Sequence, residues 1–162
     1  MFIMSDRSLN IEREYIDLNE YKIANCIGCF GCWTKTPSKC VIRDDATKIY
    51  PQIAASDCLI YVNRVKYGGY DTVMKKMHER ALPIQQAFIK LVDGEAHHYQ
   101  RNVARKDAII IAYGTSSKEE EEIFSELIER NSYNMNFKSY QLIFVEEENI
   151  DQEVTKWIKH WS

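Results

Sequence analysis

The stretch Asp107-Ala-Ile-Ile-Ile-Ala-Tyr113 decides the fold class of this chain. An unbroken apolar run of this kind is typical of a strand that is buried on both faces of a parallel sheet. It is followed by the turn Gly114-Thr-Ser-Ser117 and then by an apolar stripe at helical spacing over residues 123–128. Strand, turn and helix in this order form the repeating unit of an α/β protein.

Similar units flank this stretch on both sides. Asp57–Val62 predicts another central strand, which leads through a turn into an amphipathic helix from about Asp71. Tyr140–Val145 predicts a later strand, and Glu153–Trp161 predicts a closing helix. The sequence therefore predicts a single domain over residues 1–162, with a parallel sheet covered by helices on both faces.

The N-terminal unit is unusually short. Phe2–Met4 and Arg13–Leu18 predict two strands, and only Ser5–Glu12 separates them. A crossover between parallel strands needs at least about 10–12 residues including its helix. We therefore expect the first crossover helix to be missing.

Composition excludes several classes of protein. The chain has 162 residues and a formal charge of −3, with both signs mixed, which gives no footprint for nucleic acid or an anionic membrane. No apolar run approaches the ~20 residues that span a bilayer, and Asp6 and Arg7 interrupt the N-terminus too early for a signal peptide. We expect a cytoplasmic protein with reduced thiols. Its five cysteines then favour metal, cluster or redox chemistry over disulfides.

A cysteine-rich loop over residues 25–43 carries the strongest chemical signal. Its spacing is C-x2-C-x2-C-x7-C, formed by Cys26, Cys29, Cys32 and Cys40. Iron–sulfur clusters are held by four thiolates, and a C-x2-C-x2-C run is a typical source of three. Zinc also takes four thiolates, usually from two separated C-x2-C pairs. Three interpretations follow from the spacing: a 4Fe-4S cluster, a zinc ion, or a metal-free loop whose cysteines pack or exchange thiols.

The segment from Cys26 to Trp33, followed by Cys40-Val-Ile-Arg-Asp44-Asp45, resembles the NADPH-dependent FMN reductase family and its iron–sulfur flavoprotein branch. The resemblance covers roughly residues 11–145. It implies a flavodoxin-like, doubly wound sheet of strand order 2-1-3-4-5, with FMN at the carboxyl ends of the strands. It also implies NAD(P)H as an electron donor and a 4Fe-4S cluster as a second redox group.

Carried over by position, the resemblance also implies which residues contact FMN. The loop after the third strand would lie along the flavin ring: Asn63, Arg64, Val65, Lys66, Tyr67, Gly68 and Gly69. The loop after the fourth strand would add Gly114, Thr115 and Ser116. Tyr67 and Trp33 are candidates to stack on the ring. Ser5 and Arg7 would form a smaller substitute for the usual phosphate-binding loop. The negative charge of Asp6 would weaken phosphate binding there.

The leading hypothesis is an FMN-dependent oxidoreductase or electron-transfer flavoprotein, with the cysteine-rich loop as a one-electron relay. The alternative is a flavin-free subunit or binding module without turnover, because losing the phosphate-binding helix should remove most phosphate affinity. Thiol-based switching would need a depressed thiol pKa. The expected partner is a small-molecule or protein electron donor or acceptor, and exposed sheet edges favour a homo-oligomer such as a dimer. His97 and His98, on the long excursion after Pro83, are either exposed on a surface loop or contact substrate or flavin across a dimer interface.

Overall fold

The computed structural model of the protein describes residues 1–161. The central sheet contains the parallel strands β1 (Phe2–Ser5), β2 (Ile16–Asp17), β3 (Cys58–Lys66), β7 (Lys106–Tyr113) and β8 (Phe137–Phe144). They lie in the order β2-β1-β3-β7-β8, and the short strand β4 (Gly69–Tyr70) pairs antiparallel with the end of β3. Counted among the parallel strands, this is the order 2-1-3-4-5. The predicted flavodoxin-like α/β fold is therefore confirmed.

Helices cover both faces of this sheet. Their bounds are α2 (Ala46–Ala55), α3 (Thr72–Arg80), α4 (Lys118–Asn134) and α5 (Ile150–His160). The first three pack on one face, where Ile49, Met77 and Phe124 join the larger cluster of buried side chains. Helix α5 packs on the other face through Ile150 and Val154. Within residues 1–161, no helix is both long and apolar enough to cross a bilayer.

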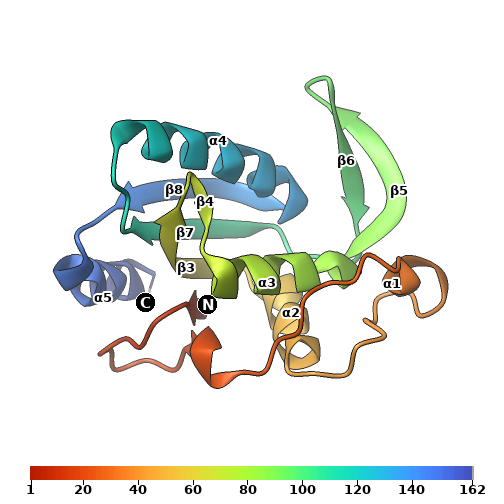
Figure 1. The fold of residues 1–162 in the computed structure, drawn as a ribbon, viewed down its shortest axis with the longest axis horizontal. Coiled ribbons are helices and arrows are strands. Elements are labelled where there is room, and N and C mark those ends of the chain that lie inside the picture. The colour runs from red at the N-terminus through yellow and green to blue at the C-terminus, as the bar shows by residue number, and fades with distance from the viewer. Residues whose placement is uncertain (162) are drawn as a thin grey trace.

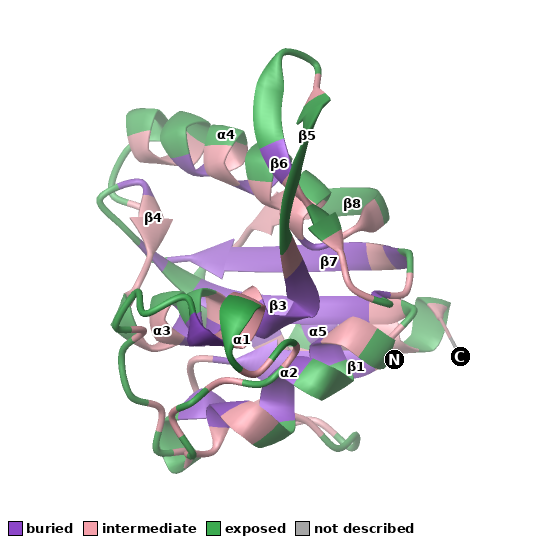
Figure 2. Ribbon diagram, turned by 90° about the vertical axis from the view of Figure 1, so that its right-hand side faces the viewer, coloured by how far each residue is buried: buried purple, intermediate pink, exposed green. Residues whose placement is uncertain are grey.

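The two apolar runs form the centre of the sheet, as predicted. In β3, Tyr61 belongs to the larger buried cluster and Ile60 to the smaller one on the opposite face. In β7, Ile110 and Ile111 divide between the clusters in the same way. Figure 2 shows both strands in purple, buried between exposed helix surfaces. Because side chains alternate between the faces of a strand, a continuous apolar run requires cover on both faces.

The predicted absence of the first crossover helix is also confirmed. Residues 6–15 connect β1 to β2 without a helix, and β2 is only two residues long, shorter than the predicted strand. The connection itself covers the sheet, because Leu9, Ile11 and Tyr15 join the cluster under α5. The Tyr15 hydroxyl fixes this segment: it accepts from the Leu9 N–H at 2.8 Å and donates to the Leu9 carbonyl at 3.1 Å.

The excursion after Pro83 is a β-hairpin rather than the long irregular loop that we expected. Strands β5 (Gln85–Val92) and β6 (Glu95–Gln100) pair antiparallel and stand apart from the main sheet (Figure 1). Their turn, Asp93-Gly94, has φ angles of 51° and 86°. Positive φ at both central residues defines a two-residue hairpin turn for which Asp-Gly is a preferred sequence. That dipeptide was the available signal.

Candidate functional site

A polar cavity lies at the carboxyl ends of β3 and β7. These strands pair through Arg64 and Tyr113, and the cavity, about 290 Å³, is lined by Arg64, Val65, Lys66, Tyr67, Asp71, Gly114, Ser116 and Glu120. We call it the crevice. Ligands of open α/β sheets bind outside the carboxyl ends of the strands, near the point where strand order reverses. The crevice is therefore the candidate binding site that the fold itself indicates.

Six of the predicted flavin contacts line the crevice: Arg64, Val65, Lys66, Tyr67, Gly114 and Ser116. The others lie elsewhere. Asn63 is fully buried beneath the crevice, and neither side-chain amide atom has a partner. Thr115 donates its hydroxyl to Glu121 at 3.1 Å. Gly69 lines a neighbouring groove of about 650 Å³ between α3 and α4.

The segment after β3 is a tight hairpin, not the open loop that the resemblance implied. Strand β3 continues to Lys66, and the chain reverses at Tyr67 and Gly68, which have φ angles of 53° and 70°. The Tyr67 side chain is 85% exposed, so it is free to stack on a ring. Trp33 lies elsewhere: its Nε1 donates to the Leu82 carbonyl at 3.2 Å, and its ring lies 4.5 Å from that of His98.

Carboxylates of the protein itself occupy the backbone donors of the crevice. Glu120 accepts from the N–H groups of Tyr67 at 3.1 Å and Ser116 at 2.8 Å, and from the Ser116 hydroxyl at 2.9 Å. Those hydrogen bonds lower the pKa of Glu120. Sequence reasoning missed Glu120. The sequence pattern that could have indicated Glu120 is the capping-box spacing: it lies three residues after Ser117, the N-cap residue of α4.

Asp6 is the second carboxylate at this edge of the sheet. It directly follows β1 and accepts from the Arg64 N–H at 2.6 Å and the Tyr113 hydroxyl at 2.9 Å. Its own N–H donates to the Val62 carbonyl at 3.1 Å. Hydrogen bonds to β3 and β7, whose carboxyl ends lie side by side, therefore fix Asp6 at this edge of the sheet.

The expected phosphate residues are already engaged. The Arg7 guanidinium donates to Glu147 at 2.8 Å, and the Ser5 hydroxyl accepts from the Arg7 N–H at 3.1 Å. Within the described residues, no helix lies between β1 and β2, although a helix N-terminus at that place is what normally receives a phosphate in this fold. Because Asp6 also adds negative charge there, these residues do not fit the phosphate of FMN.

Asp6→Asn is expected to flatten the pH dependence of stability. Burial raises the pKa of the Asp6 carboxyl above its ordinary value of 3.8; hydrogen bonds from Arg64 and Tyr113 oppose the rise, and the charge of Asp71 adds to it. Such a carboxyl stabilises the fold while protonated, and this contribution is lost as the pH rises through the folded-state pKa. The stability of the variant relative to the native protein should therefore increase from about pH 4 toward neutral pH. Urea unfolding at a series of pH values measures this difference, and parallel curves would contradict the assignment.

The four cysteines of the cysteine-rich loop lie close enough together for their charges to interact. Burial raises the pKa of the Cys32 thiol, and charges on Cys40, Cys26 and Cys29 raise it further. All are free thiols, and Cys29 is exposed. Among residues 1–161, no three His, Cys, Asp or Glu side chains are already arranged to hold a metal ion. A raised thiol pKa also disfavours thiol switching, which needs a reactive thiolate.

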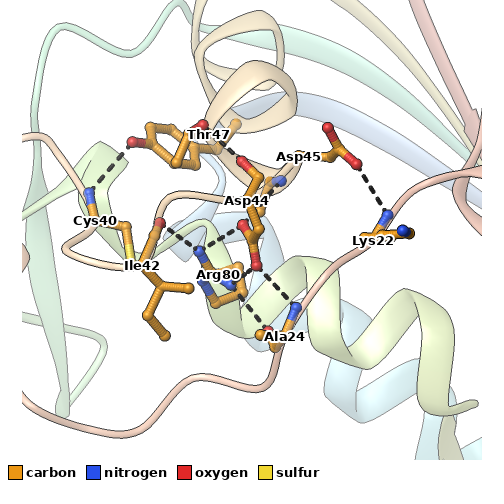
Figure 3. A network of polar contacts seen from close by, with 10 residues as sticks. Lys22, Ala24, Cys40, Ile42, Asp44, Asp45, Thr47 and Arg80 are labelled. Atoms are coloured by element: carbon orange, nitrogen blue, oxygen red, sulfur yellow. Dashed lines mark hydrogen bonds and ion pairs between the residues drawn. The ribbon is translucent and has the colours of Figure 1, made fainter.

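Arg80 closes both ends of the cysteine-rich loop (Figure 3). Its buried guanidinium donates to the Asp44 carboxylate at 2.6 and 2.8 Å, to the Ala24 carbonyl at 3.0 Å and to the Ile42 carbonyl at 3.2 Å. Although burial alone would raise it, the pKa of Asp44 is lowered by hydrogen bonds from Arg80 and Ala24. The loop is thus tied to the C-terminal end of α3 by a charge-assisted, bidentate pair.

The cysteine-rich loop and the crevice lie at opposite ends of α3. Asp71, which lines the crevice, is the N-cap residue of this helix, and Arg80 is its last residue. Nine helical residues span about 13 Å. His97 and His98 are not the two exposed histidines of a surface loop: His97 is buried and His98 is half-buried. Their Nδ1 atoms contact Asn134 Oδ1 at 3.2 Å and the Gln86 carbonyl at 2.8 Å, respectively.

Together, the strand order and the crevice define a flavodoxin-like α/β protein that carries an added cysteine-rich loop. No protein-family model matches the chain. The chain is 33% identical over 78 residues to an iron–sulfur flavoprotein of Methanocaldococcus jannaschii. This match spans 48% of the chain and 39% of that protein's length. It confirms the resemblance to iron–sulfur flavoproteins.

Solved structures share the fold. An azoreductase, AzrA, matches with a TM-score of 0.58 and 10% identity over 97% of this chain and 91% of its own. The FMN-dependent NADH-azoreductase of Bacillus anthracis, solved with FMN, matches with a TM-score of 0.56 and 11% identity. The match covers 90% of this chain and 77% of that protein. The NAD(P)H:quinone oxidoreductase of Methanothermobacter marburgensis matches with a TM-score of 0.55 and 9% identity. The match covers 97% of this chain and 93% of that protein. At these identities the likeness establishes the fold alone.

Proposed function

We propose that the protein is an electron-transfer oxidoreductase that exchanges electrons between a flavin docked at the crevice and a centre held by the cysteine-rich loop. The spacing of Cys26, Cys29, Cys32 and Cys40 in the sequence carries this proposal. The match to an iron–sulfur flavoprotein supports it. NAD(P)H is the proposed source of electrons, as the NAD(P)H-dependent proteins of the same fold suggest.

The donor set of the loop fits an iron–sulfur cluster. Four thiols at the spacing C-x2-C-x2-C-x7-C supply the ligands of a 4Fe-4S cluster, namely Cys26, Cys29, Cys32 and Cys40. When bound, such a cluster supplies one-electron transfer. Burial, and then the charges of the other three thiols, raise the pKa of Cys32. A bound metal centre would oppose this rise, because coordination deprotonates a thiol.

The surrounding residues prepare the loop for that role. Arg80 and Asp44 hold its two ends at α3, so the loop has little freedom to unfold when it is unloaded. In the same loop the Phe30 ring stacks on Trp33, with 5.5 Å between the ring centroids. Exclusion of water and hydrogen bonding to thiolates are the protein's means of setting a redox potential.

At the crevice, Tyr67 would stack on the flat flavin ring, and the cations Arg64 and Lys66 would lie beside it. We propose that the flavin is an exchanging partner rather than a tightly resident FMN, since the phosphate position does not fit. An FMN-dependent reductase with resident cofactor is the second candidate, favoured by the fold that the chain shares with FMN-dependent enzymes. A cytoplasmic location and self-association are part of the proposal, on the grounds of cysteine usage and exposed strand edges.

Cys32→Ser is expected to remove most of the iron that the protein binds under anaerobic conditions. Cys32 interacts with each of the other three thiols, so its loss leaves an incomplete ligand set. Iron and sulfide assays after anaerobic reconstitution measure the effect. Cys58→Ser is the matched control, because Cys58 is a free cysteine on β3, outside the loop. Equal iron content in both variants would contradict the proposal. If the protein binds zinc and no iron, the loop is a structural metal site rather than a cluster site.

A further inference from the structure

We infer that the Asp6 carboxylate is a built-in anion that takes the phosphate position of the flavin site, so that the crevice favours an unphosphorylated flavin over FMN. This inference deepens the proposed function, and it rests on that function in treating the crevice as the flavin site.

The position of Asp6 is the first part of the argument. In a sheet of order 2-1-3-4-5, the phosphate of a bound nucleotide lies beyond the end of β1, at the point where strand order reverses. Asp6 is the first residue after β1, which pairs with β2 on one side and β3 on the other. Its carboxylate therefore lies where the fold normally receives an anionic ligand.

The contacts of Asp6 are the second part. The carboxylate accepts from a backbone N–H at the end of β3, that of Arg64, and from a hydroxyl at the end of β7, that of Tyr113. A backbone N–H and a hydroxyl are the groups that commonly bind phosphate oxygens. The Asn19 amide donates to the Asp6 carbonyl at 2.6 Å and fixes the backbone beneath the side chain. The donors of an anion site are present and are satisfied internally.

Charge is the third part. The phosphate of FMN carries close to two negative charges, and a carboxylate within a few ångströms would repel it strongly at the low effective dielectric of a partly buried site. Arg7, the cation that follows Asp6 in the chain, is paired with Glu147 and forms no ion pair with Asp6. Riboflavin has the same ring as FMN but no phosphate, so it escapes this repulsion.

The test compares FMN and riboflavin on the full-length native protein, Asp6→Asn and Asp6→Ser, by quenching of flavin fluorescence. We expect the native protein to bind FMN no more tightly than riboflavin. Each Asp6 variant should shift the FMN-to-riboflavin affinity ratio at least roughly tenfold toward FMN. Glu120→Gln is the matched control: it removes an equal charge from the crevice, on the α4 side, and should leave the ratio near its native value. Asp6→Ser covers the case in which Asp6→Asn fails to fold.

Each contrary outcome separates the inference from the proposed function. If the native protein binds FMN ten times more tightly than riboflavin, or if the ratio is unchanged in the Asp6 variants, the inference is overturned while flavin docking stands. If Glu120→Gln shifts the ratio as much as the Asp6 variants do, the effect is one of general charge and the inference also fails. If no variant binds either flavin, both the inference and the docking of flavin at the crevice fail. The iron content of the cysteine-rich loop is measured independently of all these outcomes.

Discussion

Arg80→Ala should destabilise the protein by about 3 kcal/mol or more, because it leaves the Asp44 carboxylate without its cation in a largely buried site. The substitution also removes the donors of the Ala24 and Ile42 carbonyls, which flank the cysteine-rich loop. For a chain of this size, 3 kcal/mol corresponds to roughly 10 °C in melting temperature. Thermal and urea unfolding measure the change.

Two further variants show whether the stability depends on the bidentate geometry of the Arg80 guanidinium or only on its positive charge. Arg80→Lys keeps the charge but cannot reproduce the bidentate pair and two carbonyl bonds, so it should be clearly destabilised as well, though less than Arg80→Ala. Arg105→Ala, at an exposed arginine, should change stability by less than about 0.5 kcal/mol. If Arg80→Ala melts within 2 °C of the Arg105 variant, the Arg80–Asp44 pair does not hold the loop.

Gly68→Ala should destabilise the protein by about 2–4 kcal/mol, the sum of backbone strain and overpacking. Gly68 has a φ of 70°, in the left-handed region that an alanine adopts only at a cost. A Cβ atom there would lie 2.5 Å from Cγ2 of Ile123 on α4, which no side chain tolerates without movement. Gly68 therefore couples the Tyr67 hairpin to α4, and urea unfolding of the variant measures that coupling.

Gly94→Ala is the matched control for Gly68→Ala. Gly94 also has a positive φ, 86°, but a Cβ atom there would meet nothing within 4 Å. It should therefore show only the backbone strain, about 1 kcal/mol. Ile123→Ala removes the Cγ2 atom but keeps the Cβ atom, which would lie 2.8 Å from the new one. In the double variant, Gly68→Ala should therefore recover part of the overpacking, a coupling of about 1 kcal/mol in the cycle. Equal destabilisation by the two glycine substitutions, with no coupling to Ile123, would contradict the packing argument.

The sequence predicted the fold where one local pattern determined the outcome. The continuous apolar run in β7 required a strand covered on both faces, and the eight residues Ser5–Glu12 were too few for a crossover helix. The hairpin of β5 and β6 was missed because its strands are mostly exposed and carry no clear alternation. The dipeptide Asp93-Gly94 favours a two-residue hairpin turn, and on that basis the hairpin could have been predicted.

The site was predictable only in part. The segments that end at the carboxyl edge followed from strand order, which is why Arg64, Tyr67 and Ser116 meet at the crevice. The role of Asp6 depends on contacts across long stretches of sequence, such as the bond from Arg64 to Asp6, 58 residues apart. No local pattern reports such a contact. The sequence also gave no reason to separate Trp33 and the thiols from the crevice by the length of α3.

The most direct test of the account is to purify the protein anaerobically, desalt it, and measure iron, sulfide and flavin in the same sample. The account predicts about four iron atoms per chain on the cysteine-rich loop, with flavin well below one equivalent because nothing holds its phosphate. One equivalent of retained FMN in a protein free of iron would contradict it.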